Sequence, residues 1–243
     1  MDERIDKTGF TKIEDMKILL AAATWMEVKL LAEEFDFESE TNEILSKYAF
    51  AGNEIEILIT GIGTTFTTFR LTKILQQQNY DMVINLGIAG SLKPGLKIGE
   101  VVNVVSDEFA DLGIEQREKF LTLFETDFIE ANEFPFYGGV LKAALPNGWL
   151  KLKSVHAITT NKSHGRKNSI KDLKQKFDAD METMEGAAVF FVCLNLGLPC
   201  YQIRAISNYV EPHDPSKWDI PAALINLKST FLKLLKNLPV PVN

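Results

Sequence analysis

The sequence has few of the residues that build metal centres and disulfides. Its 243 residues include only two cysteines, Cys193 and Cys200, and three histidines that are scattered along the chain. Both cysteines lie in apolar runs, which is typical of a reduced, cytoplasmic protein. The histidines have no metal-ligand spacing, so we expect no metal site.

Long apolar runs and dense positive charge are missing as well. No apolar run reaches the length that crosses a bilayer, and residues 1–15 lack the apolar stretch of a secretory signal. The net charge is −7, and the lysines are spread along the chain rather than gathered in a basic stripe. We therefore expect a cytoplasmic protein that binds neither nucleic acid nor membranes.

What is present fits one large globular domain. Hydrophobic residues make up 46% of the chain and charged residues 24%, which are ordinary values for a soluble fold. We interpret residues 1–15 as a polar N-terminal extension and residues 16–239 as a single folded domain.

Apolar runs of strand length alternate with helical patterns. The expected strands are 17–23, 55–60, 82–86, 101–105, 155–160 and 200–206, and the expected helices are 26–35, 66–77, 170–177, 184–196 and 222–235. Continuous apolar strands that alternate with helices predict an α/β fold of three layers, with helices on both faces of the sheet.

Polar and small residues follow several of these strands. In such sheets ligands bind beyond the carboxyl ends of the strands, so Glu27, Gly61–Gly63, Gly87–Gly90 and Ser207–Asn208 are expected to converge on one pocket. Each also has a plainer interpretation. Glu27 would favour the dipole of a helix start, the glycines would form packing turns, and Asn208 would be a turn residue.

Two buried charges need an explanation, because an unpaired charge in an apolar setting costs free energy. Glu185 heads an apolar helix, where it could serve as a helix-start charge or accept hydrogen bonds from the vicinal hydroxyls of a ribose. Arg204 lies in an apolar strand, and a buried arginine is usually paired, so we expect an ion pair with Glu27 or Glu185.

Four segments together resemble one known family. They are Trp25-Met26-Glu27-Val28, the run from Ile84 to Gly90, Met184-Glu185, and the run from Arg204 to Asn208. Their types and order resemble the purine nucleoside phosphorylase/nucleosidase superfamily. The likeness is greatest to its hydrolytic branch, and within that branch to futalosine hydrolases. The resemblance implies a central mixed sheet of the nucleoside phosphorylase type. It also implies a homodimer or higher homo-oligomer and no cofactor.

The resemblance also assigns roles to residues of this chain. It implies that Glu27 activates water, that Arg204 helps to place this water, that Glu185 binds the ribose hydroxyls and that Asn208 holds the purine. The other substrate-contacting residues that it implies are Met184, Ser207, Gly63, Ile88, Ala89 and Gly90.

Three departures from the family bear on the reaction. Asn85 stands where bacterial phosphorylases have a phosphate-binding arginine, which favours water as the nucleophile. Asn208 replaces the aspartate of methylthioadenosine enzymes, and its amide can donate to O6 and N7 of a 6-oxopurine but cannot supply a proton. Ile88, where those enzymes have serine, removes a polar contact near the base.

The expected reaction is hydrolysis of the N-glycosidic bond of futalosine to hypoxanthine and dehypoxanthine futalosine, a step of menaquinone biosynthesis. The alternatives are 5′-methylthioadenosine/S-adenosylhomocysteine nucleosidase, a phosphate-dependent purine nucleoside phosphorylase, and a non-catalytic nucleoside-binding protein. Futalosine carries a carboxyphenyl ketone tail at its 5′ end, which an aromatic pocket with one cation would suit. The candidates are the phenylalanines of residues 107–137 with Arg117, and the pair His164 and Arg166.

Overall fold

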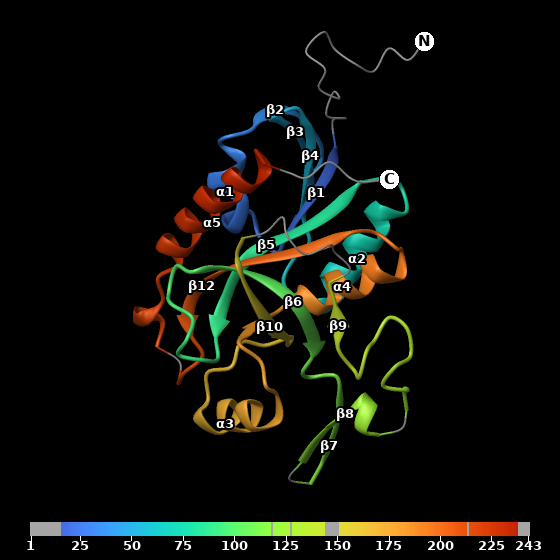
Figure 1. Cartoon of the computed structure of the whole chain (residues 1–243), viewed down its shortest axis with the longest axis vertical. Helices are drawn as coiled ribbons and strands as arrows, with labels where there is room; N and C mark the ends of the chain where they lie inside the picture. Colours follow the sequence, from blue (N-terminus) through green and yellow to red (C-terminus); the bar gives the residue numbers. More distant parts are fainter. Residues whose placement is uncertain (1–15, 118, 127, 144–150, 213, 238–243) are drawn as a thin grey trace.

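A large β-sheet with helices on both sides forms the body of the molecule (Figure 1). The computed structural model describes residues 16–117, 119–126, 128–143, 151–212 and 214–237. The predicted N-terminal extension, His213 and the last two residues of the predicted domain lie outside these ranges.

Twelve strands and five α-helices occur in the described residues. The strands are β1 (Lys17–Ala22), β2 (Asp36–Asn42), β3 (Leu45–Phe50), β4 (Asn53–Ile59), β5 (Met82–Ser91), β6 (Val101–Phe109), β7 (Gly113–Gln116), β8 (Lys119–Thr122), β9 (Leu141–Lys142), β10 (Lys153–Thr159), β11 (Met181–Thr183) and β12 (Cys200–Tyr209). The helices are α1 (Trp25–Ala32), α2 (Thr64–Leu75), α3 (Lys167–Lys176), α4 (Gly186–Asn195) and α5 (Ile220–Leu235).

The strand order is β11-β10-β6-β12-β5-β1-β4-β3-β2, with β9 added beside β6. The central strands β4, β1, β5 and β12 are parallel, whereas β6 runs antiparallel to β12, so the sheet is mixed as expected. Strand β11 also pairs with β5, which closes β5, β12, β6, β10 and β11 into a ring. The carboxyl ends of β1, β4, β5 and β12 therefore share one edge.

Two hydrophobic layers cover the sheet. One unites α1 and α5 with one face through residues such as Val28, Leu31, Leu227 and Phe231. The other unites α2 and α4 with the opposite face, through residues such as Leu71, Ile74 and Phe190. Figure 1 shows α1 and α5 on one side of the strands and α2 and α4 on the other. Because β1 is buried along almost its whole length, its apolar run Ile18–Ala22 is continuous rather than alternating. The α/β prediction with helices on both faces is confirmed.

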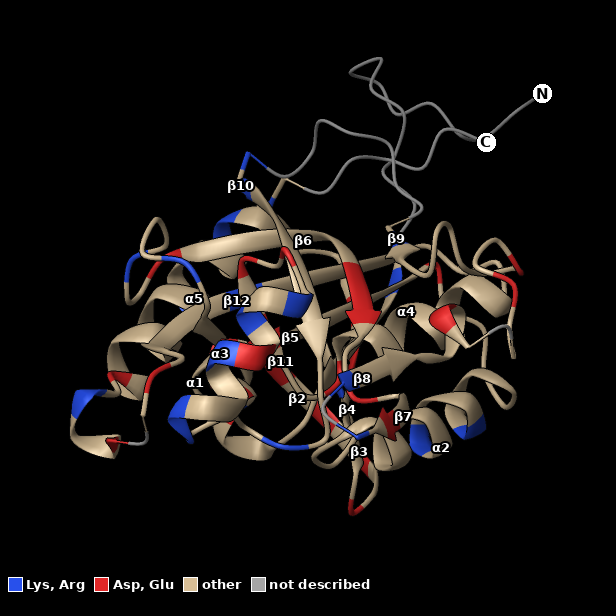
Figure 2. Ribbon diagram, turned by 90° about the horizontal axis from the view of Figure 1, so that it is seen from below, with Lys and Arg blue, Asp and Glu red and all other residues tan. Residues whose placement is uncertain are grey.

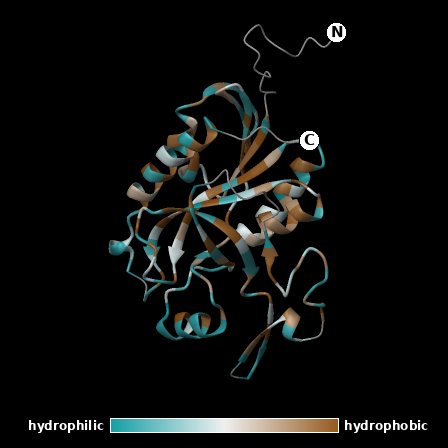
Figure 3. Ribbon diagram, viewed as in Figure 1, coloured by the Kyte–Doolittle hydropathy of each residue, from teal (hydrophilic) through white to brown (hydrophobic). Residues whose placement is uncertain are grey.

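The distribution of polarity follows these layers. The strands are largely hydrophobic, while teal and brown residues alternate along α3 and α5 (Figure 3). Lys, Arg, Asp and Glu are scattered over many elements (Figure 2). Within the described ranges, each helix falls short of the length and apolar character that a membrane crossing requires.

Three boundaries differ from the predictions in ways that matter for the site. Gly87–Gly90 was expected to be a turn, but it continues β5 in an extended conformation. Strand β12 likewise runs on through Ser207 and Asn208 rather than ending before them. Helix α4 begins at Gly186, so Glu185 is its N-cap rather than a residue of the first turn.

The hairpin of β2 and β3 was not predicted at all. All seven residues of β2 are exposed and polar residues dominate it, so it lacks the apolar period-two signal that marks a half-buried strand. Because β2 is the edge strand of the sheet, no core face is required of it.

Candidate active site

Glu27 connects the first helix with the middle of the sheet. Its Oε2 accepts hydrogen bonds from the backbone N–H of Thr24 at 3.0 Å and from the Thr24 hydroxyl at 3.3 Å, which forms a capping box at the start of α1. Its Oε1 accepts the backbone N–H of Ile88 on β5 at 3.1 Å. The carboxylate is therefore both a helix cap and a fixed group at the carboxyl edge of the sheet.

Gly87 allows two charged groups to approach β5 from the same side. A Cβ atom at this position would lie 2.3 Å from Nη1 of Arg204 and 2.5 Å from Oε1 of Glu27. Any side chain would therefore occupy the space of both groups, and glycine is the residue that leaves it open. Glu27 and Arg204 face each other across this point.

Arg204 is fully buried and is held by amides rather than by a carboxylate. Its Nε donates to Oε1 of Gln202 at 3.2 Å, and its Nη2 donates to Oδ1 of Asn85. Asn85 in turn donates from Nδ2 to the carbonyl of Ala21 at 2.9 Å. Nη1 of Arg204 has no hydrogen-bond partner among the described residues. The expected direct ion pair with Glu27 or Glu185 is thus wrong, and one guanidinium nitrogen is left with its donors unused.

A buried carboxylate that the sequence did not single out supports this arrangement. Asp107 accepts hydrogen bonds from Nε2 of Gln202 and from the hydroxyl of Thr159, both at 2.9 Å. The same Thr159 hydroxyl accepts the N–H of Ala187 in the first turn of α4 at 2.8 Å. Asp107 therefore connects, through one neighbour each, to Arg204 and to the start of the helix behind Glu185.

The setting of Asp107 changes its acidity. Burial raises the pKa of Asp107 to about 7, against the opposing effects of the hydrogen bonds from Gln202 and Thr159 and of the charge on Arg204. The neighbours of Asp107 in the chain, Ser106 and Glu108, are polar as well, so its burial gave no signal in the sequence. Gln202 did give one, because it lies between Tyr201 and Ile203 in an apolar strand.

Glu185 forms a third charged group of the site. Its side chain is almost fully buried, and its Oε1 accepts the backbone N–H of Gly63 at 3.0 Å. Gly63 has φ +90°, a conformation that favours glycine. Burial raises the pKa of Glu185; the charge of Arg204 acts in the opposite direction, and the charge of Glu27 adds to the rise. Met184, which precedes Glu185, is half-buried. The charges of Glu27, Glu185 and Arg204 thus influence one another in one site.

Asn208 and Ser207 lie farther along the same edge. The register between β12 and β5 shifts between Ile206 and Asn208, so Ser207 is an extra residue in a bulge. The Ser207 hydroxyl lies 2.8 Å from Oδ1 of Asn208 and 3.2 Å from the carbonyl oxygen of Ala89. Nδ2 of Asn208 donates to the carbonyl of Tyr209 at 3.1 Å. One amide N–H therefore remains for a base, one fewer than the expected donation to both O6 and N7 requires.

The predicted substrate-contacting residues form two groups along β5. Gly63 and Ile88 lie with Glu27 and Glu185, whereas Ala89 and Gly90 lie with Ser207 and Asn208. A Cβ at Gly90 would lie 3.3 Å from Nδ2 of Asn208. Gly87 and Gly90 are three strand residues apart, or about 10 Å, which is the scale of a nucleoside.

The residues expected to bind the 5′ tail of the substrate differ in burial and in their contacts. His164 lies against Glu182 through its ring and its backbone N–H, and both side chains are buried, so this imidazole is already engaged. This engagement argues against the pair His164 and Arg166. Arg117 lies exposed at the turn of the β7–β8 hairpin with φ 56°.

The aromatic segment 107–138 divides into inward and outward side chains. Phe124 packs on Phe136, which in turn contacts Phe191 of α4. Phe128, Phe134 and Tyr137 are largely exposed.

No group of three or more histidine, cysteine, aspartate or glutamate side chains in the described part of the chain is arranged to hold a metal ion.

Curated proteins share sequence similarity with this chain over most of its length. Futalosine hydrolase of Thermus thermophilus is 29% identical over 222 residues, which cover 89% of this chain and 94% of that protein. Aminodeoxyfutalosine nucleosidase of Helicobacter pylori is 26% identical over 228 residues, which cover 91% of this chain and 97% of that protein.

Solved structures share the fold. The native structure of futalosine hydrolase of Helicobacter pylori strain 26695 superposes with a TM-score of 0.77 at 20% identity, and covers 92% of this chain and 98% of that one. The family model described as the phosphorylase superfamily matches residues 17–238. The chain therefore belongs to the phosphorylase superfamily.

Proposed function

We propose that this protein hydrolyses the N-glycosidic bond of a 6-oxopurine nucleoside. The observation that carries this proposal is the unpartnered, buried Nη1 of Arg204, which faces the Glu27 carboxylate across Gly87. A buried donor without a partner costs free energy, and a water molecule or a substrate oxygen placed there would satisfy it.

The proposed reaction has few parts. The bond between C1′ and N9 breaks, and its electron pair leaves with the base. Glu27 takes a proton from water while the water oxygen bonds to C1′, and Arg204 holds that oxygen. Glu185 accepts hydrogen bonds from the ribose hydroxyls, and its negative charge stabilises the positive ribosyl group of the transition state. Met184 packs on the sugar. The general-base assistance by Glu27 should raise the rate roughly 10²–10⁴-fold.

The leaving base requires a proton, and solvent supplies it. Asn208 holds the base through its remaining amide N–H, with Ser207 fixing the orientation of the amide. An amide donates a hydrogen bond to O6 or N7 without transferring the proton, so the enzyme forgoes acid catalysis at this position. We place this N–H at O6, because adenine offers a donor at its 6-position that the N–H cannot satisfy, whereas N7 is an acceptor in both bases.

Water rather than phosphate is the proposed nucleophile. Asn85 carries no charge, and both of its polar groups are used, one by Arg204 and one by the carbonyl of Ala21. The position that would otherwise hold a phosphate-binding arginine is therefore occupied by a support for Arg204.

Futalosine is the proposed substrate, with hypoxanthine and dehypoxanthine futalosine as products, in menaquinone biosynthesis. The relatives named as futalosine hydrolases, in Thermus thermophilus and Streptomyces coelicolor, support this choice. A second candidate is 5′-methylthioadenosine/S-adenosylhomocysteine hydrolysis, which the relative of that name in Tolumonas auensis favours at 26% identity. Asn208 argues for the 6-oxopurine.

The proposal includes a homodimer or larger homo-oligomer in the cytoplasm. Ile62, Phe66 and Phe69 at the start of α2 are 54%, 57% and 69% exposed. They flank Gly63, which binds Glu185, so a second copy seated there would border the site. Cys193 and Cys200 are buried and free, which suits a reducing compartment.

Product analysis tests the proposal. The protein is incubated with futalosine, methylthioadenosine or inosine, with and without phosphate, and the products are separated by chromatography. We expect hypoxanthine from futalosine at a rate that phosphate does not change. Formation of a sugar 1-phosphate, or faster release of adenine than of hypoxanthine, would contradict it.

A further inference from the structure

Helix α2 begins at a glycine that belongs to the site. Gly63 is the N-cap residue of α2, and its N–H donates to Oε1 of Glu185 at 3.0 Å. An N-cap residue usually carries a side-chain oxygen that accepts one of the free N–H groups of the first turn. Glycine has no such oxygen, so the residue that serves Glu185 leaves the start of α2 without a cap of its own.

Asn161 supplies the missing cap from another loop. Its Oδ1 accepts hydrogen bonds from the backbone N–H of Thr64 at 2.9 Å and from the Thr64 hydroxyl at 2.8 Å. A Cβ atom at Gly63 would lie 3.2 Å from the same Oδ1, which is a tight contact. Asn161 therefore lies directly against Gly63 and fixes the residue that follows it in the chain.

Asp111 holds Asn161 in turn. Its Oδ2 accepts the backbone N–H of Asn161 at 2.6 Å, and its two carboxylate oxygens lie 3.3 and 3.4 Å from Nδ2 of Asn161. An amide suits the middle position, because its NH₂ group donates to the carboxylate while its oxygen accepts from Thr64. Asp111 and Asn161 each lie two residues beyond a strand, β6 and β10, so these bonds join both strand ends to the start of α2.

We infer that Asp111 and Asn161 are positioning residues for Glu185. Glu185 is 5% exposed, so its charged form depends on nearby donors, and the N–H of Gly63 is one of them. Asn161 holds the residue after Gly63, and Asp111 holds Asn161, so a shift of either would move this N–H away from the carboxylate. The inference rests on the proposed function, since it concerns the carboxylate proposed to bind the ribose hydroxyls.

Replacing the amide by a carboxylate tests the inference. The measured quantity is the ratio of kcat/KM for futalosine to kcat/KM for its 2′-deoxy analogue, which lacks one of the hydroxyls that Glu185 is proposed to bind. We expect Asn161→Asp to lower this ratio roughly three- to tenfold. The introduced carboxylate would face that of Asp111, and the repulsion would displace the start of α2.

Exchanging both partners should restore the ratio. In the double variant Asp111→Asn/Asn161→Asp, the amide and the carboxylate trade places, so a donor faces an acceptor again and Thr64 keeps an acceptor oxygen. We expect its ratio to lie within about twofold of that of the unaltered protein, because the two changes are coupled. A protein that is merely destabilised by each change would not recover in this way.

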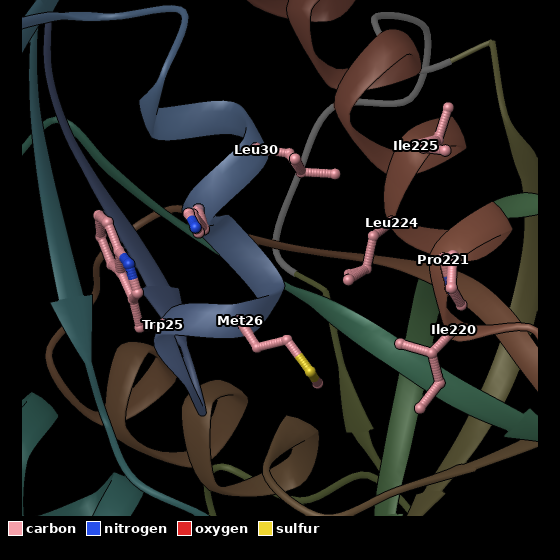
Figure 4. A pocket seen from close by; sticks show the side chains of 8 residues that line it. Trp25, Met26, Leu30, Ile220, Pro221, Leu224 and Ile225 are labelled. Carbon is pink, nitrogen blue, oxygen red and sulfur yellow. The ribbon is translucent and has the colours of Figure 1, made fainter.

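Two controls separate positioning from added charge and from a general loss of stability. Asn168→Asp adds the same charge at an exposed residue of α3 whose side chain has no hydrogen bond with a described residue. Leu224→Ala removes buried atoms of α5 from an apolar groove between α1 and α5, whose lining includes none of the proposed site residues (Figure 4). It should lower Tm, and both controls should leave the ratio unchanged.

The outcomes separate this inference from the proposed function. An unchanged ratio in Asn161→Asp, or a ratio that the double variant fails to restore, would overturn the positioning role while hydrolysis stands. A fall of the same size in Leu224→Ala would also overturn it, since the ratio would then follow stability. If the unaltered protein releases base from neither nucleoside, the proposed function itself fails.

Discussion

The two ends of β1 carry two different kinds of charge cluster. At the amino end, Glu56 is fully buried, and Lys17 and Lys47 contact it at 3.0 and 3.2 Å while the Tyr80 hydroxyl donates to it at 2.5 Å. At the carboxyl end, Glu27, Glu185 and Arg204 are held by backbone N–H groups and by amides. The first cluster pairs its charges, and the second keeps them apart.

This difference separates a structural cluster from a binding site. Burial acts to raise the pKa of Glu56, but the hydrogen bonds from Tyr80, Lys17 and Lys47 together hold it below its usual value. For Glu185, burial prevails and the pKa is raised. A cluster whose charges neutralise one another has little left to offer a ligand, whereas Arg204 retains an unused nitrogen.

Replacing one carboxylate at each end of β1 should give the largest difference in kcat between two variants. Glu27→Gln removes the proposed base and should lower kcat by about 10²–10⁴-fold, while calorimetry finds nucleoside affinity nearly unchanged. Glu56→Gln should preserve kcat and lower the free energy of unfolding by about 1–3 kcal/mol, because the lysines and Tyr80 lose a charged partner. Equal effects of the two variants on kcat would remove the distinction.

A methyl group at Gly87 should have the next largest effect. In Gly87→Ala the new Cβ would lie where Nη1 of Arg204 and Oε1 of Glu27 now approach, so both must move. We expect kcat/KM to fall by about 10²-fold, the scale of a small misplacement of catalytic groups. Gly95→Ala is the control, since no atom lies within 4 Å of its added Cβ. Full activity in Gly87→Ala would show that the two groups need not meet there.

Asp107→Asn should change the pH dependence of stability. With a folded pKa of about 7 against a usual 3.8, Asp107 contributes stability at low pH that is lost as the pH rises through about 7. The lowered pKa of Glu56 has the opposite sign, since its contribution is lost as the pH falls. In urea titrations, the unfolding free energy of the unaltered protein should fall by on the order of 4 kcal/mol between about pH 4 and pH 7. Asp107→Asn should lack this decline.

Asp107→Asn should affect activity less than Glu27→Gln and Gly87→Ala do. The amide introduced by Asp107→Asn would offer one acceptor oxygen in place of two, so either Gln202 or Thr159 loses its partner and Arg204 or the start of α4 shifts. We expect kcat/KM to fall about tenfold. The same pH slope in both proteins would show that Asp107 is not the titrating group.

The sequence predicted the alternation of strands and helices, because buried strands such as β1 are continuous apolar runs. It also pointed to Glu27, Glu185, Arg204 and Asn208 as polar residues in apolar surroundings. It misplaced Gly87–Gly90, because glycines are typical of turns, while here they are extended to admit side chains from β12 and α1. The amide supports of Arg204 were out of reach, since they depend on the register of β5, β6 and β12.

The smallest expected effect is on base preference. Asn208→Asp supplies an acceptor, and a proton when protonated, in place of the amide donor. The ratio of hypoxanthine to adenine release, measured with matched inosine and adenosine, should shift roughly tenfold toward adenine. Ser207→Ala, which removes the hydroxyl beside Oδ1 of Asn208, should shift it less. An unchanged ratio in Asn208→Asp would place the base edge elsewhere.

The most direct test of the proposed site at the carboxyl end of β1 is a crystal structure of Glu27→Gln with intact futalosine bound. We expect to find the ribose hydroxyls on Glu185, the oxygen-bearing edge of the purine at Asn208 and a water molecule on Nη1 of Arg204. A nucleoside bound away from Gly87, or Nη1 turned to a protein carboxylate with no water beside it, would rule out the proposed arrangement.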